Sequence, residues 1–243
     1  MAHSRTAAAF TLRELVVVIA VMFVLMLFLI PALQRARDKS KRITCVGRLK
    51  CLGLAYRIWS NDNGDHFPAS TSLTNGGWRE LLSRPDASTY AWTNYTLMAN
   101  QMGQSPLIVV CPADERKPAN SFSNLSNLNC SYFVGIDAND TYPQSILGGD
   151  RNLGPGTTPV PDYGFSPANG KGNDVTINGP VCWSLKMHSR GNPAGAGNIL
   201  LGDGSSQQMT SGSLNQNWLT NAFTANPSLN KATNSPGMRL IFP

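Results

Sequence analysis

Apolar residues form one long uninterrupted run near the start of the chain and only short runs elsewhere. Leu15–Ile30 is 16 consecutive apolar residues, which as an α-helix would be about 24 Å long. With Phe10–Leu12 and Pro31–Leu33 the segment reaches the roughly 20 residues that cross a membrane. The run is too long for an ordinary signal peptide, and no small-residue cleavage site follows it. The pattern therefore predicts a membrane-spanning helix over residues 10–33.

A helical period continues beyond this run. Between residues 34 and 65, apolar side chains recur every three or four positions, which is the spacing of one helix face. They are Ile43, Val46, Leu49, Leu52, Tyr56 and Trp59. The segment Asn61–Asp65 (NDNGD) is a strong helix stop. Residues 34–65 are thus predicted to be an amphipathic stem whose apolar stripe packs on a globular domain.

The region 66–243 has short apolar runs among many Gly, Asn, Pro and Ser residues. Strands are predicted at Pro106–Cys111, Ser131–Ile136, Asn198–Gly202, Ser205–Met209 and Arg239–Phe242. Asp203-Gly204 is a favoured two-residue hairpin turn. A short helix is expected over 214–222, capped at Ser213, and 139–180 is expected to form ordered loops. The predicted fold class is α+β, with a long N-terminal helix packed on a small antiparallel sheet.

Charge is concentrated in one part of the chain. The net charge is +6, but residues 1–61 hold ten of the 20 Lys and Arg residues and only Glu14 and Asp38 among the acids. The remaining residues are slightly acidic overall. A nucleic-acid-binding domain would carry a basic face on its folded surface, so no nucleic-acid partner is expected.

The residues before the apolar run form a specific motif. Ala9-Phe10-Thr11-Leu12-Arg13-Glu14-Leu15 resembles the cleavage and methylation site of type IV prepilins and type II secretion pseudopilins. In that family a short basic leader is cut before a Phe, a Glu follows at the fifth mature position and a Pro at the twenty-second. Phe10, Glu14 and Pro31 fall at these positions. Ala9 replaces the usual Gly, and Arg13 replaces a usual apolar residue.

The resemblance implies a processing pathway, a location and partners. Met1–Ala9 would be a leader (residues 1–9), removed by a prepilin peptidase that then methylates Phe10. The chain would cross the bacterial inner membrane once, with residues 66–243 in the periplasm or on a surface filament. Other pilin-like subunits and the secretion or pilus assembly machinery would be its partners. Glu14 would be neutralised by the α-amine of Phe10 on a neighbouring subunit, and Pro31 would allow a helix kink.

A second stretch resembles one bacterial subgroup of the same family. Ile43–Val46, Leu49–Lys50 and Asn61–Pro68 carry the likeness near the N-terminus. The subgroup has a C-terminal signature, His-x9-Asp-Gly, and His188, Asp203 and Gly204 match its residue types. Their spacing here is 14 residues instead of nine, so 192–197 is interpreted as a loop insertion.

Few residues point to chemistry in the globular region. No hydrolase, zinc-protease or phosphate-loop motif is present, so the protein is not expected to be an enzyme, and a cofactor is not expected. Calcium is the alternative, because some pseudopilins bind it in a C-terminal loop. Asp137, Asn139 and Asp140 would supply the hard oxygen ligands that calcium prefers.

Five cysteines occur in a chain that is expected to be exported. Cys45 and Cys51 lie on different faces of one predicted helix and cannot bridge each other. Cys111, Cys130 and Cys182 are the disulfide candidates, and the odd count leaves at least one thiol unpaired or intermolecular. A zinc site is not expected, since no short Cys-x-x-Cys pair exists.

Two functions of different classes follow from these patterns. The first is a structural subunit of a type IV pilus-like or type II secretion pseudopilus filament that polymerises through its N-terminal helix. The second is a non-polymerising, membrane-tethered binding module in the periplasm or on the surface. The charge of Glu14 distinguishes them, because only the filament subunit requires it.

Overall fold

The computed structural model describes residues 11–189, 192–215 and 237–243. The chain divides into two compact units, residues 1–40 and residues 41–243. Helix α1 (Leu12–Asp62) contributes to both, because its last 22 residues belong to the second unit. The stem that was predicted as a separate segment is therefore largely part of the globular unit.

The first unit contains the apolar part of α1. This helix is long and apolar enough to cross a membrane, and none of the residues in its most apolar part is buried. Pro31 lies inside α1 without ending it. The helical conformation predicted for residues 10–33 is confirmed for its described part, from Leu12 onward, and the membrane span itself stays a prediction.

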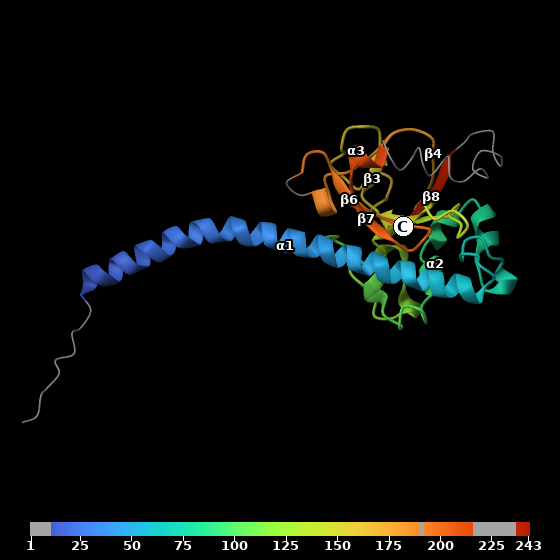
Figure 1. The fold of residues 1–243 in the computed structure, drawn as a ribbon, viewed down its shortest axis with the longest axis horizontal. Coiled ribbons are helices and arrows are strands. Elements are labelled where there is room, and N and C mark those ends of the chain that lie inside the picture. The colour runs from blue at the N-terminus through green and yellow to red at the C-terminus, as the bar shows by residue number, and fades with distance from the viewer. Residues whose placement is uncertain (1–10, 190–191, 216–236) are drawn as a thin grey trace, which may run out of the picture. The chain divides into compact units, whose positions relative to one another are not determined.

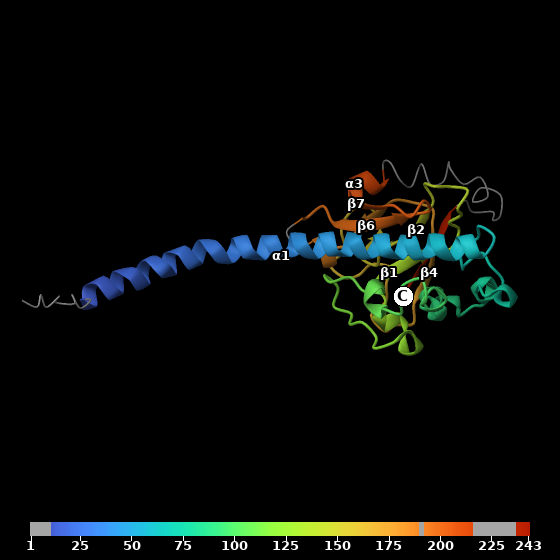
Figure 2. The same ribbon diagram turned by 60° about the horizontal axis from the view of Figure 1, so that its bottom comes forward.

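The second part of α1 packs on the globular unit through one face (Figure 2). Its buried residues are Cys45, Leu49, Leu52, Gly53, Ala55, Tyr56, Trp59 and Ser60. The predicted apolar stripe is confirmed from Leu49 onward. It is wrong at its start, because Ile43 is 57% exposed and Cys45 is buried in its place. The helix ends at Asp62, as the stop signal predicted.

A six-stranded antiparallel sheet forms the centre of the second unit (Figure 1). Its strand order is β4-β8-β1-β2-β6-β7. The strands are β1 (Tyr132–Gly135), β2 (Ile146–Asp150), β4 (Asn173–Ile177), β6 (Ala196–Leu201), β7 (Ser206–Thr210) and β8 (Met238–Phe242). A separate two-stranded sheet pairs β3 (Leu153–Pro155) with β5 (Val181–Trp183). The α+β layout of a long helix and a small antiparallel sheet is as predicted.

Short helical turns fill the segment between α1 and β1, and two more, η7 (Met187–Ser189) and α3 (Ser211–Ser213), lie between strands. The α-helical ones are α2 (Thr93–Thr96) and α3. The 3-10 turns are η1 (Leu73–Asn75), η2 (Arg79–Ser83), η3 (Ala87–Tyr90), η4 (Pro106–Val109), η5 (Phe122–Asn124), η6 (Asn127–Asn129) and η7. Most of residues 66–131 is therefore a series of single turns.

The central strands β1, β2 and β6 are buried on both faces, whereas the edge strands β4 and β7 are partly exposed. Side chains alternate between faces along a strand, so Val134 and Leu200 join the core that contains α1, while Phe133 and Ile199 join a second core with Trp183. Both cores are apolar, so the central strands are buried along their whole length.

Two sequence-based assignments in this region are wrong. Pro106–Val109 is a 3-10 turn instead of a strand, and 139–180 contains strands β2, β3 and β4 instead of loops alone. Gly148 and Gly149 occupy β2 because a Cβ at Gly149 would lie 2.8 Å from the Asn198 oxygen and from the Phe133 ring. Such a strand shows no alternation of apolar and polar side chains, and this hid it in the sequence.

The predicted helix over 214–222 lies mostly outside the described residues. The turn that precedes it, α3, is capped by Thr210, whose side chain accepts a hydrogen bond from the Ser213 amide. The cap predicted at Ser213 would pair with Gln216, which lies outside the described residues.

Candidate functional site

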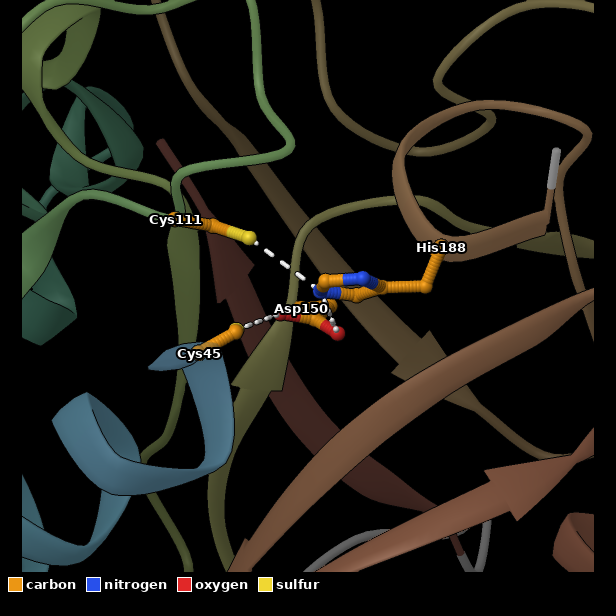
Figure 3. Close-up of side chains that lie close together, drawn as sticks. All are labelled: Cys45, Cys111, Asp150 and His188. Atoms are coloured by element: carbon orange, nitrogen blue, oxygen red, sulfur yellow. Dashed lines mark hydrogen bonds and ion pairs between the residues drawn. The ribbon is translucent and has the colours of Figure 1, made fainter. Parts of the chain in front are cut away.

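Four buried side chains meet beside the large sheet: Cys45, Cys111, Asp150 and His188 (Figure 3). We call this group the buried cluster. One ligand atom from each residue lies within 4.8 Å of those of the other three. Cys45 comes from α1, Cys111 from the loop after η4, Asp150 from the end of β2 and His188 from η7. Four segments far apart in sequence thus converge on one point.

The contacts inside the buried cluster are short. Cys111 Sγ lies 3.1 Å from His188 Nε2, and Cys45 Sγ donates to Asp150 Oδ1 at 3.2 Å. His188 Nε2 lies 3.5 Å from Asp150 Oδ2, and these two side chains are 1% and 0% exposed. The groups therefore interact with one another in place of water.

Local structure fixes two members of the cluster, Asp150 and His188. Asp150 ends β2 in register with Tyr132 of β1, and its Oδ2 accepts hydrogen bonds from the Asn198 backbone amide at 2.7 Å and side-chain amide at 2.8 Å. Ser189, next to His188, exchanges hydrogen bonds with Ala196 of β6. The strand pairing and these polar contacts hold the carboxylate and the imidazole in place.

The environment shifts the acid–base behaviour of all four groups. Burial raises the pKa of Asp150, although His188 and hydrogen bonds from Cys45 and Asn198 oppose the shift. Burial alone would lower the pKa of His188, but Asp150 and Cys111 outweigh it and raise that pKa. Burial also raises the pKa of Cys45. For Cys111, hydrogen bonds with Cys45 and His188 outweigh burial and lower its pKa.

Two thiols, an imidazole and a carboxylate are all ligands for a borderline metal ion. Without an ion, the same groups form a hydrogen-bonded network whose members satisfy one another. Among the described residues, Cys45, Cys111, Asp150 and the His188 side chain are all almost fully buried. The arrangement can therefore hold a metal ion or form a hydrogen-bonded link between four segments.

The C-terminal signature residues separate in the structure. His188 belongs to the buried cluster, with Cys111 and Asp150 as partners. Asp203 and Gly204 form the turn between β6 and β7, where Asp203 Oδ1 accepts from the Ser205 amide at 2.8 Å. The predicted hairpin is therefore confirmed, and the contacts of the Asp203 side chain are those of a turn residue.

The calcium candidates are each engaged by protein groups. Asp137 Oδ2 accepts from the Arg239 amide at 2.7 Å, and Asn139 Oδ1 accepts from the Thr141 amide at 2.8 Å. Asp140 forms an ion pair with Arg57. Asp137 and Asn139 thus accept hydrogen bonds from backbone amides, and Asp140 pairs with an arginine.

All five cysteines are free thiols in the structure. Of the disulfide candidates, Cys130 donates to the Ser126 carbonyl at 3.4 Å and Cys182 to the Thr158 carbonyl at 3.0 Å. Cys111 faces His188 instead. These three candidates therefore have three different sets of partners.

The N-terminal motif is described from Thr11 onward, so Ala9 and Phe10 lie outside the described residues. Glu14 Oε2 accepts from the Thr11 amide at 2.8 Å and from its hydroxyl at 2.9 Å. The Glu14 amide in turn donates to Thr11 Oγ1 at 3.4 Å. This reciprocal pattern is a capping box, so Glu14 helps to begin α1.

Sequence reasoning found His188 and Cys111 as separate residues and missed that they meet. Cys45 interrupts the apolar stripe of α1 at a buried position, and Asp150 is a charged residue after two glycines. Neither a cysteine within an apolar helix face nor an aspartate after two glycines indicates a binding site unless the fold is known. Comparison with protein-family models, with curated proteins and with solved structures finds no match to this chain.

Proposed function

We propose that this protein is a structural subunit of a type IV pilus-like or type II secretion pseudopilus filament. The observation that carries the proposal is the exposed apolar part of α1, with Glu14 at its start. Cleavage after Ala9 by a prepilin peptidase would place Phe10 at the new N-terminus. The globular unit would form the outer, periplasmic part of the filament.

The exposed apolar side chains of α1 indicate that this part of the helix is covered by something other than water. The side chains of Leu15, Phe23 and Phe28 are 53%, 66% and 73% exposed, and burial of apolar surface is favourable by about 25 cal/mol per Å². A lipid bilayer or the same helices of neighbouring subunits would cover this surface. A membrane-stored subunit uses both environments in turn.

Glu14 supports the filament over a simple anchor. A carboxylate beside an apolar span is costly unless it is neutralised. Thr11 gives it hydrogen bonds but no positive charge. In the proposed filament, the α-amine of Phe10 on a neighbour supplies that charge and sets the register between subunits.

A membrane tether that never polymerises is the second candidate. The capping box favours it, because Glu14 then has a sufficient local role at the start of α1. The two candidates differ in whether the charge of Glu14 or only its hydrogen bonds matter. Variants of Thr11 and Glu14 separate these contributions.

The first experiment determines the N-terminus and intact mass of the protein from its native membrane fraction. We expect a chain that starts at Phe10 and carries one added methyl group. A chain that keeps Met1 or Ala2 would contradict processing and would leave the tether as the better candidate.

The second experiment tests assembly with Glu14→Leu and, as a matched control, Thr11→Val. Glu14→Leu is expected to insert into the membrane and to abolish filaments, because it removes the charge that pairs with the amine. Thr11→Val removes the cap hydroxyl, worth about 1 kcal/mol, and should leave filaments in place. Electron microscopy of sheared filaments and membrane fractionation measure both outcomes. Filaments of normal abundance with Glu14→Leu would contradict the proposal.

A further inference from the structure

We propose that the buried cluster of Cys45, Cys111, Asp150 and His188 is a closed structural zinc site. It joins the stem of α1 to the sheet of the globular unit. The inference concerns residues 41–243 alone, so it holds whether or not the protein forms filaments.

The spacing of the ligand atoms fits a tetrahedral zinc ion. Zinc binds sulfur at about 2.3 Å and nitrogen or oxygen at about 2.0–2.2 Å, so neighbouring ligands should lie about 3.3–3.8 Å apart. Cys111 Sγ lies 3.1 Å from His188 Nε2. The two oxygens of Asp150 face different groups, with Oδ1 3.2 Å from Cys45 Sγ and Oδ2 3.5 Å from His188 Nε2. All pairs are within 4.8 Å. Small side-chain adjustments would therefore accommodate the ion.

The ligand types select zinc over harder cations. Calcium and magnesium prefer sets of oxygen ligands, and this site offers one carboxylate. Two thiols with an imidazole suit zinc. Binding releases the two thiol protons to solvent as each sulfur forms a bond to the ion. Two thiolates, one carboxylate and the divalent cation leave one net negative charge, which the nearby Arg42 opposes.

A second layer of contacts orients the ligands. Asn198 donates twice to Asp150 Oδ2. The Ala113 amide donates to Cys111 Sγ at 3.4 Å, and the Tyr132 hydroxyl lies 3.3 Å from Cys45 Sγ. Such outer contacts fix ligand orientation in zinc sites. They mark a prepared arrangement instead of a chance meeting of four side chains.

The site has the features of a structural centre. Four protein ligands complete a tetrahedron, whereas catalytic zinc keeps one position open for water. Cys45, Asp150 and the His188 side chain are all almost fully buried. Because such a site does not exist in the unfolded chain, the free energy of zinc binding becomes free energy of folding. Zinc would thus hold α1, the loop after η4, β2 and η7 together.

Metal content of the full-length protein is the first test. The chain is purified in detergent from its native membrane fraction without added metal, and its bound metals are measured by mass spectrometry. We expect about one zinc per chain, as for a single four-ligand site. Cobalt exchanged into the protein should give the absorption of a tetrahedral thiolate site. Zinc removal by a strong chelator should lower the melting temperature.

Variants assign the zinc to this site. Cys45→Ser should lose the zinc, while Cys51→Ser, an exposed cysteine on the same helix, should retain it. Because Cys45→Ser could fail to fold, Asn198→Ala provides a second test that keeps all four ligands. Loss of an outer contact typically weakens metal affinity about 10–100-fold, and we expect a decrease of that order in a chelator competition.

Two results would overturn the inference. One is a folded chain with free thiols at Cys45 and Cys111 that binds no zinc and whose melting temperature does not change when the chelator is added. The other is a native disulfide between Cys45 and Cys111, seen as a mass lower by two hydrogens and a cross-linked peptide. That bond would consume both sulfur ligands.

Discussion

At the scale of single residues, a buried ion pair next to the buried cluster is the most consequential contact. Arg151 makes two parallel hydrogen bonds to Asp114, at 2.7 and 2.8 Å. The two side chains are 4% and 0% exposed, and the Arg151 guanidinium lies 3.4 Å from the centre of the Tyr163 ring. Burial alone would raise the pKa of Asp114, but Arg151 outweighs it and lowers that pKa.

We expect Asp114→Asn to destabilise the protein strongly. The substitution leaves the Arg151 charge buried without its partner, which typically costs about 3–5 kcal/mol. Glu115→Gln is the matched control, because Glu115 is exposed and its ion pair with Lys186 should contribute no more than about 1 kcal/mol. Denaturant unfolding of each variant measures the difference. Equal losses would show that the Asp114 pair adds nothing beyond a surface pair.

The same pair predicts the direction of an acid effect. The pKa of Asp114 in the folded protein lies below the unfolded value of about 3.9. The stabilisation by the ion pair is therefore complete above that value and is lost as the pH falls through the folded pKa. The unfolding free energy should therefore drop below about pH 4, and Asp114→Asn should flatten this drop. If the unfolding free energy of Asp114→Asn fell as steeply in acid as that of the unmodified protein, other carboxyl groups would cause the effect.

At the scale of elements, Gly53 allows the stem of α1 to pack closely against the β6–β7 turn. Gly53 lies against the β6–β7 turn, where an added Cβ would meet the Gly204 oxygen at 2.5 Å and a Leu200 methyl at 2.8 Å. Gly204 itself has φ +82°, which a glycine adopts without strain. Ser206 also donates to the Val46 carbonyl at 3.1 Å. The close approach of helix and hairpin thus depends on the absence of a side chain.

Gly53→Ala should destabilise the second unit, and Gly47→Ala should not. The new methyl at Gly53 meets backbone that cannot move freely, and overpacking of this kind costs about 1–3 kcal/mol. Gly47 lies on the same helix with nothing within 4 Å of its added Cβ, so alanine there should stabilise by about 0.5–1 kcal/mol. Thermal unfolding followed by circular dichroism compares the two. A stabilising Gly53→Ala would contradict the close contact.

At the scale of the whole molecule, α1 runs through both units of the chain. Residues 41–62 supply eight buried residues to the second unit, whereas the described apolar residues of the first unit are exposed. The helix is thus one element with two different environments. Its second part is a component of the globular core.

Two deletions test this division. Removal of residues 1–40 should give a water-soluble protein that unfolds cooperatively, because the second unit keeps its cores. Removal of residues 1–62 should abolish cooperative unfolding, because Leu49, Leu52 and Tyr56 leave the core. Calorimetry and size-exclusion chromatography distinguish the outcomes. A shorter chain that still unfolds cooperatively would show that the stem is dispensable.

The sequence by itself determined the elements whose signal is local. An uninterrupted apolar run and a three-to-four-residue period specify α1 because neighbouring side chains on a helix face are close in sequence. The run NDNGD set its end, and Asp203-Gly204 set the β6–β7 hairpin, since turn geometry depends on few residues. The strand at Ser131–Ile136 was likewise readable from its apolar side chains.

The tertiary structure alone decided the rest. Strand β2 carries two glycines because Phe133 and Asn198 lie against its backbone, and that requirement comes from other strands. Cys45, Asp150 and His188 meet only after α1 docks on the sheet and β2 pairs with β1 and β6. No motif spacing encodes such a meeting, because the ligands come from segments whose proximity is fixed by strand order and helix packing.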